Sequence, residues 1–111
     1  MGAFATRQVV LLRFPYSDLS AQKLRPALIL ANADRGDWLL CQITSKPYAD
    51  PCAVELLQAA FATGGLQRIS YVRPSKLFTA HESLFSGVAG SLNVDAHTSV
   101  VDAVVAIVRQ G

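Results

Sequence analysis

One arginine stands where a polar segment turns into an apolar one, a position from which a side chain can bind a ligand. Arg25 precedes Pro26, and residues 26–31 are all apolar. Proline cannot donate to a strand ladder but is tolerated at the first residue of a strand, so we predict a strand over residues 26–31. Proline also drives the preceding residue towards an extended conformation. A guanidinium at the mouth of this strand would be held firmly enough to meet an anionic ligand in one geometry.

The distribution of charge supports an anionic ligand on this part of the chain. The net charge is +2, with nine Lys or Arg and five Asp or Glu in residues 1–76, but one and three in residues 77–111. The positive excess therefore falls on the part that carries Arg25. The alternative is that Arg25 is a solvated surface arginine beside a strand-opening proline, because charged side chains are usually exposed.

Short apolar runs separated by turn residues predict a mainly β domain. We expect strands over residues 8–14, 26–31, 38–44, 53–57, 69–73 and 76–79, with a hairpin loop at residues 32–37 and a stop at Pro74. Residues 83–92 are interpreted as a short helix, weakened by two glycines. Asn93 is a good N-cap for a last helix that ends at about Arg109. Five to seven short antiparallel strands predict a small bent sheet or barrel, with the closing helix packed across it.

The last helix is expected to bury one apolar face. His97, Val101, Val104 and Val108 lie on this face at helical spacing, with Val100 and Ile107 beside them.

Composition favours a single folded domain over residues 1–111 that associates with a partner. The chain has 111 residues, of which 51% are hydrophobic and 16% charged, so a core can form and disorder is excluded. Charge this sparse leaves apolar surface for a partner to cover, which favours an oligomer.

The sequence offers no pattern for a cofactor, a metal or a membrane. Cys41 and Cys52 match neither a disulfide framework nor a zinc site, so we expect buried, free thiols in a cytoplasmic protein. His81 and His97 have no carboxylate at metal-binding spacing, and no glycine-rich phosphate loop is present. No apolar run approaches the length of a membrane span.

A series of short motifs in a fixed order carries a resemblance to a known family. The motifs are VVLL at 9–12, FPYSDLS at 14–20, KLRPALIL at 23–30, CQITS at 41–45, GL at 65–66, SYVRPSKL at 70–77 and GSL at 90–92. With these motifs, over roughly residues 7–110, the chain resembles the MazF/PemK family of type II toxin–antitoxin toxins. The resemblance implies an SH3-like barrel that forms a homodimer. It also implies metal-independent cleavage of single-stranded RNA, and inhibition by a cognate antitoxin protein.

The resemblance also implies roles for particular residues. Arg25 would be the family's active-site arginine, and Thr44 and Ser45 would contact the scissile phosphate. Arg73 resembles a second active-site arginine of the PemK-like branch, which often has an acid two residues later, where this chain has Ser75. Attack by a 2′-hydroxyl builds negative charge on the phosphoryl oxygens, which a guanidinium can stabilise.

Four further residues are expected to contact RNA. They are Lys23, Lys46, Tyr16 and Asp18, which lie in or beside these motifs. For each of these, the alternative is an ordinary solvated loop residue. Thr44 and Ser45 could likewise be turn hydroxyls, and Arg73 a strand-end arginine before a proline.

A second function class stays open. The same barrel could be a non-catalytic binding protein, either similar to a gyrase poison or a decayed toxin that binds only its antitoxin, because a fold alone does not define an activity. The presence of Arg25 together with Thr44 and Ser45 favours the enzyme.

Overall fold

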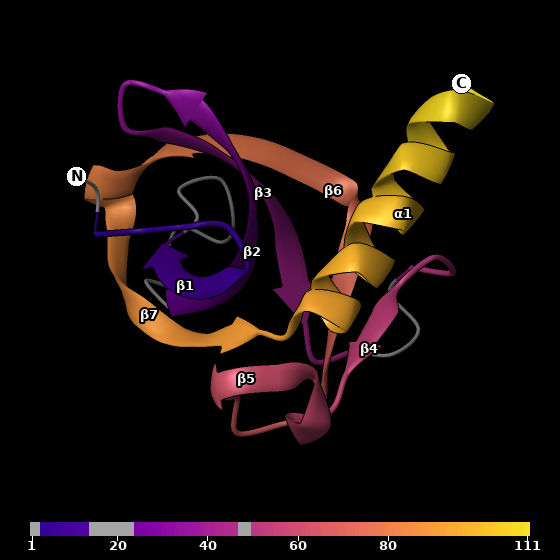
Figure 1. The fold of residues 1–111 in the computed structure, drawn as a ribbon, viewed down its shortest axis with the longest axis horizontal. Coiled ribbons are helices and arrows are strands. Elements are labelled where there is room, and N and C mark those ends of the chain that lie inside the picture. Colours follow the sequence, from indigo (N-terminus) through magenta and orange to yellow (C-terminus); the bar gives the residue numbers. More distant parts are fainter. Residues whose placement is uncertain (1–2, 14–23, 47–49) are drawn as a thin grey trace.

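The computed structural model describes residues 3–13, 24–46 and 50–111, which form seven strands, two short 3₁₀ segments and an α-helix (Figure 1). Their order is β1 (Gln8–Arg13), β2 (Leu24–Asp34), β3 (Asp37–Thr44), β4 (Val54–Leu56), η1 (Gln58–Ala60), β5 (Phe61–Gly64), β6 (Ser70–His81), η2 (Glu82–Leu84), β7 (Phe85–Leu92) and α1 (Val94–Gln110). No helix within these ranges is long and apolar enough to cross a membrane.

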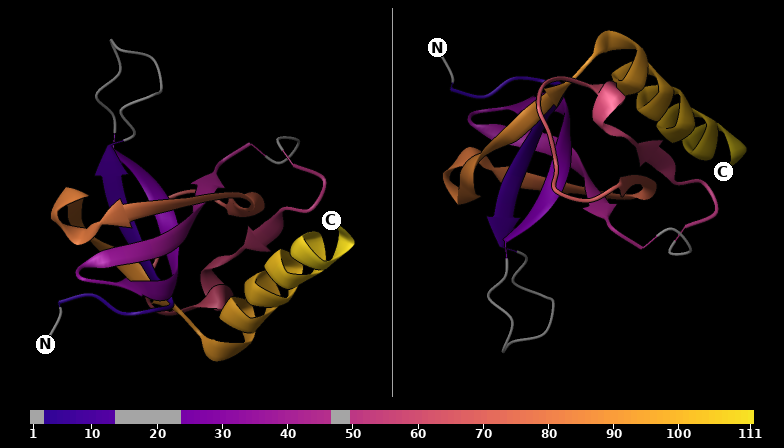
Figure 2. Two further views of the ribbon diagram at one scale, coloured as in Figure 1. Left: turned by 90° about the horizontal axis from the view of Figure 1, so that it is seen from above. Right: turned by 90° about the horizontal axis from the view of Figure 1, so that it is seen from below.

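All seven strands form one antiparallel sheet in the order β4-β6-β3-β2-β1-β7-β5. The sheet curls into a half-barrel, and α1 packs beside β4 and β6 (Figures 1 and 2). The prediction of a small, mainly β barrel with a C-terminal helix is confirmed.

The central strands are buried on both faces, which is why they read as nearly continuous apolar runs. Successive side chains of a strand point to opposite faces, and this alternation produces two apolar clusters. The helix-side cluster, which includes Val100 of α1, also contains Val9, Leu28, Cys41, Ile43, Leu56, Val72 and Leu92. The far-side cluster contains Val10, Leu12, Ala27, Ile29, Trp38, Leu40 and Ala80.

A two-residue turn joins β2 to β3, so both strands extend into the predicted loop at residues 32–37. Asp34 pairs with Asp37 across the turn. Arg35 and Gly36 have φ values of +56° and +83°, as expected for a tight hairpin whose two central residues both have positive φ. A Cβ atom on Gly36 would lie 2.6 Å from Nε2 of His81, so packing also requires a glycine there.

Pro26 lies inside β2 and not at its first residue, which corrects the predicted start of the strand by two residues. It pairs with Leu11 of β1, and pairing with β3 begins one residue later, at Ala27 with Gln42. Pro26 therefore has a neighbouring strand on one side only, where a missing N–H can be tolerated.

β6 continues through Pro74, where the sequence predicted a strand end. Cys41 of β3 pairs with Leu77 and Ile43 pairs with Val72, so residues 73–76 of β6 stand opposite Gln42 alone. These extra residues form a bulge, which leaves them outside the regular ladder. Pro74 is accommodated there because a residue outside the ladder does not need a backbone N–H that donates to the neighbouring strand.

The predicted helix at residues 83–92 is wrong, because most of this segment is the strand β7. β7 pairs with β1 on one side and with β5 on the other. A Cβ atom on Gly90 would lie 2.5 Å from the carbonyl oxygen of Thr63, so the glycine lets β5 approach closely. Gly90, which would weaken a helix, therefore allows a close contact between two strands.

The last helix forms where it was expected, from the N-cap Asn93. The Asn93 side-chain oxygen accepts a hydrogen bond from Ala96 N–H at 2.8 Å. The buried side is centred on Val100, while Val108, which was expected on the buried face, is 66% exposed. His97, Val101 and Val104 of the predicted face are half-buried, so only Val108 of these four residues lies away from the core.

We expect Gly90→Ala to lower the free energy of unfolding by about 1–3 kcal/mol, because the new methyl group would clash with the backbone of β5. Gly87→Ala in the same strand is the matched control, because a Cβ atom there meets nothing within 4 Å. Urea denaturation of both variants measures the difference. Equal stabilities would show that β5 does not pack on β7 at Gly90.

Candidate active site

Arg25 is the second residue of β2, at the end of the strand that precedes its pairing with β3. It pairs with Leu12 of β1, and its side chain is exposed. Arg25 lines a cavity of about 530 Å³, with Thr44, Ser45 and Lys46 at the end of β3 also in its wall. The structure thus brings together residues that lie about twenty positions apart in the sequence.

The strand register places Arg25 and Thr44 on the same face of the sheet. Ala27 of β2 pairs with Gln42 of β3, and Arg25 and Thr44 each lie two residues further towards the same end. Since side chains alternate, both share the face of the Ala27–Gln42 pair. That pair marks the edge of the far-side cluster, so the two polar residues stand beyond the apolar part of this face.

Arg73 of β6 belongs to the same face. Thr44 pairs with Tyr71, and Arg73 lies two residues beyond Tyr71, after the inward-facing Val72 of the helix-side cluster. Three neighbouring strands, β2, β3 and β6, therefore carry Arg25, Thr44 and Arg73 on one face. Arg73 is not among the residues that line the 530 Å³ cavity.

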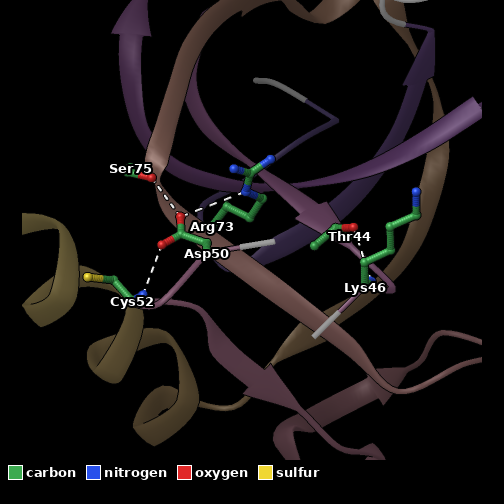
Figure 3. A network of polar contacts seen from close by, with 6 residues as sticks. All are labelled: Thr44, Lys46, Asp50, Cys52, Arg73 and Ser75. Carbon is green, nitrogen blue, oxygen red and sulfur yellow. Dashed lines mark hydrogen bonds and ion pairs between the residues drawn. The ribbon is translucent and has the colours of Figure 1, made fainter. Parts of the chain in front are cut away.

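The hydroxyl of Thr44 is oriented by the chain that follows it. The backbone N–H of Lys46 donates to Thr44 Oγ1 at 3.2 Å (Figure 3). A hydroxyl that accepts one hydrogen bond can still donate its own hydrogen. Thr44 can therefore donate to an anionic oxygen in front of β3.

A buried carboxylate accompanies Arg73. Asp50 Oδ2 lies 3.7 Å from Arg73 Nε and accepts a hydrogen bond from Ser75 Oγ at 2.6 Å, while Oδ1 accepts from Cys52 N–H at 2.9 Å (Figure 3). The Asp50 side chain is only 4% exposed. Burial raises the pKa of Asp50, but the hydrogen bonds from Ser75 and Cys52 and the charge of Arg73 together outweigh it and lower the pKa.

The residue at position 75 nevertheless contacts an acid that lies elsewhere in the chain. Ser75 hydrogen-bonds to Asp50, which lies in the segment between β3 and β4. Sequence reasoning missed Asp50 because no local pattern links it to a strand more than twenty residues away. It also missed Arg68, an exposed cation that lines the 530 Å³ cavity and counts towards the basic excess of residues 1–76.

Three of the residues expected to bind RNA, Tyr16, Asp18 and Lys23, lie outside the residues that the structure describes. The fourth, Lys46, is exposed and lines the cavity with Arg25. With Arg68, the described wall of the cavity thus contains three basic side chains.

The histidines and cysteines have other surroundings. The ring of His81 accepts a hydrogen bond from Ser83 N–H at 3.0 Å, and burial with the charge of Arg7 lowers the pKa of His97. Cys41 is buried, which raises its pKa to about 12, whereas Cys52 is exposed, contrary to expectation. In the described ranges, no three His, Cys, Asp or Glu residues are grouped so that they could hold a metal ion.

Solved structures with this fold extend over nearly the whole chain. The toxin MazF-mt6 of Mycobacterium tuberculosis has a TM-score of 0.71 and 18% identity, covering 93% of this chain and 97% of the toxin. A MazF from Deinococcus radiodurans has a TM-score of 0.73 and 19% identity, with 98% and 99% covered. An endoribonuclease from a mycobacterial species, solved with its cognate antitoxin, has a TM-score of 0.73 and 17% identity, with 98% and 96% covered. Identities this low establish a MazF-like fold and nothing finer.

The family follows from the sequence match. Residues 5–108 match the family of PemK-like, MazF-like toxins of type II toxin–antitoxin systems. No curated protein sequence gives a significant match. Since the family match spans almost all of the chain, the protein belongs to this toxin family, as its motifs predicted.

The buried carboxylate predicts a specific dependence of stability on pH. The folded-state pKa of Asp50 is lower than in the unfolded chain, so its stabilising contribution is present above the ordinary aspartate pKa, about 3.9, and is lost as the pH falls through the folded-state value. We expect Asp50→Asn to cost roughly 3 kcal/mol at neutral pH, because it leaves Arg73 without its carboxylate. The difference from the parent protein should narrow as the pH approaches 3.

Denaturant unfolding between about pH 3 and pH 7 measures this difference, since that interval brackets the ordinary aspartate pKa. Asp102→Asn, at an exposed position of α1, is the control and should show no such trend. A constant difference between parent and Asp50→Asn across this interval would contradict the ion pair.

Proposed function

We propose that the protein is an endoribonuclease toxin that cleaves single-stranded RNA without a metal ion. The observation that carries the proposal is the shared face of β2, β3 and β6, where Arg25, Thr44 and Arg73 stand beyond the apolar cluster. Two guanidinium groups and a hydroxyl are donors suited to phosphoryl oxygens. The endoribonuclease of similar fold supports the same activity.

In the proposed reaction, the 2′-hydroxyl of one nucleotide loses its proton to solvent as its oxygen attacks the adjacent phosphorus, and the bond from phosphorus to the 5′-oxygen breaks. The 5′-oxygen takes up a proton from solvent, so the products are a 2′,3′-cyclic phosphate and a 5′-hydroxyl. Negative charge builds on the non-bridging phosphoryl oxygens as the new bond forms. Arg25 would place its fork of N–H donors against these oxygens, and Thr44 would donate a further hydrogen bond. Because these donors are fixed by strand ends, little reorganisation is needed when the charge develops.

The wall of the 530 Å³ cavity provides a path for the RNA backbone beside this site. Lys46 and Arg68 are exposed cations in this wall, and Ser45 adds a hydroxyl. Phosphate contacts from such groups attract RNA of any sequence and weaken as salt rises. Arg73 would act from the neighbouring strand as the second cation of the reaction.

The proposed toxin would work in the cytoplasm as a homodimer that a cognate antitoxin inhibits. Structures of MazF with MazE from Deinococcus radiodurans have this fold and support the antitoxin. The alternative is a barrel that only binds its partner, and the presence of Arg25, Thr44 and Arg73 on one face favours the enzyme.

We expect the purified protein to cut a long single-stranded RNA in EDTA and to leave a duplex of the same sequence largely intact. Arg25→Ala should slow single-turnover cleavage by about 10²–10³-fold, because a fixed donor to the developing charge is lost. Arg25→Lys should not restore the rate, because a lysine cannot present two parallel donors. Binding to an RNA with a 2′-deoxy nucleotide at the cleavage site should weaken less than cleavage.

Arg109→Ala, at the exposed end of α1, is the matched control and should cut at the parental rate. Loss of activity in EDTA with recovery in Mg²⁺ would show that the proposed mechanism is wrong. If Arg25→Ala cuts as fast as the parent, Arg25 is structural. The catalytic role would then belong to Arg73, or the proposal of an enzyme would be wrong.

The homodimer is expected to use the outer side of α1. Val94, Val105 and Val108 are 62%, 41% and 66% exposed and share this side of the helix. Sedimentation at micromolar concentration should show a dimer, and Val105→Lys with Val108→Lys should shift it to monomer. Leu84→Lys, at an exposed apolar position on η2, should stay dimeric. A parental protein that sediments only as a monomer would refute the proposal.

A further inference from the structure

Asp50 makes contacts that join two halves of the candidate site. It lies in the segment after β3, which begins directly behind Thr44, and its carboxylate reaches the bulge of β6. Oδ1 accepts from Cys52 N–H at 2.9 Å within its own segment. Oδ2 accepts from Ser75 Oγ at 2.6 Å and lies 3.7 Å from Arg73 Nε, both on β6. One buried group therefore connects residues 50–52 with the strand that carries Arg73.

The contact with Arg73 is made through Nε, not through the terminal nitrogens. A guanidinium is planar, so an anion against Nε restricts the rotation of the whole plane. Figure 3 shows the terminal nitrogens of Arg73 pointing away from Asp50. Because the side chain of Arg73 is 22% exposed, part of it remains within reach of solvent or a ligand.

Asp50 itself is poorly placed to touch a substrate. Its side chain is 4% exposed, and both of its oxygens are engaged by groups of the protein. A carboxylate in direct contact with RNA phosphate would also repel it. A carboxylate behind an arginine avoids this repulsion and can still determine where the arginine points.

We infer that Asp50 is a positioning residue for RNA cleavage, which orients Arg73 towards the substrate phosphate. The inference rests on the proposed function, because it assigns how the second arginine of that site is held. Ser75 takes part as the donor that fixes Oδ2 between itself and Arg73. The site thus depends on a carboxylate that is distant in sequence from every residue it serves.

A double-mutant cycle between Asp50 and Arg73 separates positioning from general stability. Asp50→Asn keeps the shape and hydrogen-bond acceptor of the side chain but removes its charge. We expect it to slow single-turnover cleavage by about 10²-fold, as for other displaced catalytic groups, with binding of 2′-deoxy-substituted RNA little changed. In the Arg73→Ala background, the same change should have almost no further effect, because the residue it positions is gone. Independent, additive losses would overturn the inference.

Moving the carboxylate to the neighbouring side chain provides a rescue. Ser75 Oγ lies 2.6 Å from Asp50 Oδ2, so an aspartate at position 75 would bring its carboxylate to nearly the same place. Asp50→Asn combined with Ser75→Asp should therefore recover at least about tenfold of the lost rate, because a restored position restores most of the effect of a misplaced group. Ser75→Asp alone should give no gain. If the combined variant is folded and as slow as Asp50→Asn, the inference is wrong.

A readout that does not depend on activity distinguishes this inference from the proposed function. The Nε–H of Arg73 can be followed by nitrogen NMR, and its exchange with water should be at least about tenfold faster in Asp50→Asn, because a buried N–H held against an anion exchanges slowly. Ser75→Ala is the milder variant should Asp50→Asn fail to fold, and should accelerate exchange less. Unchanged Nε–H exchange overturns the positioning contact whether or not the parent cuts RNA. A parent that cuts no RNA overturns the proposed function, and with it the catalytic part of the inference.

Discussion

The pairing register of β2, β3 and β6 is the constraint on which the candidate site depends. Each of Arg25, Thr44 and Arg73 is placed by its distance from a paired position, either Ala27 with Gln42 or Thr44 with Tyr71. A slip by one residue would turn a side chain to the opposite face of the sheet. Such a slip is opposed by the two apolar clusters, since it would move their members to the opposite face, where they would not fit the packing. Burial of the sheet on both faces therefore fixes the positions of polar groups that contribute little to the core.

The bulge in β6 allows polar side chains to meet at the candidate site. Residues 73–76 stand opposite a single residue of β3, so their side chains are freed from the ladder without ending the strand. Pro74 is tolerated in the bulge, while Arg73 and Ser75 on either side of it meet Asp50. A buried carboxylate is costly unless it is paired and hydrogen-bonded, and here two hydrogen bonds, from Ser75 Oγ and Cys52 N–H, and the ion pair with Arg73 meet this requirement. The same contacts hold Asp50 against β6.

The sequence predicted what depends on local chemistry. The N-cap Asn93, the apolar strands and the position of Arg25 before Pro26 all have local signals, and the structure contains a helix and strands there. It failed where a distant partner decides the conformation. Pro74 was predicted to end a strand, but the bulge opposite β3 accommodates it. The segment around Gly90 was predicted to be a weak helix, but it is a strand against which β5 packs. The pairing of Asp50 with Arg73 had no local signal, because it depends on the fold of the whole sheet.

The proposed site of cleavage is the face shared by β2, β3 and β6. The most direct measurement is a crystal structure of the protein with a single-stranded RNA that carries a 2′-deoxy nucleotide at the cleavage site. The phosphate at that site is expected to lie within hydrogen-bond distance of the Arg25 guanidinium and the Thr44 hydroxyl, with Arg73 on its other side. A phosphate bound away from Arg25 and Thr44, on the helix side of the sheet, would show that cleavage does not take place on this face.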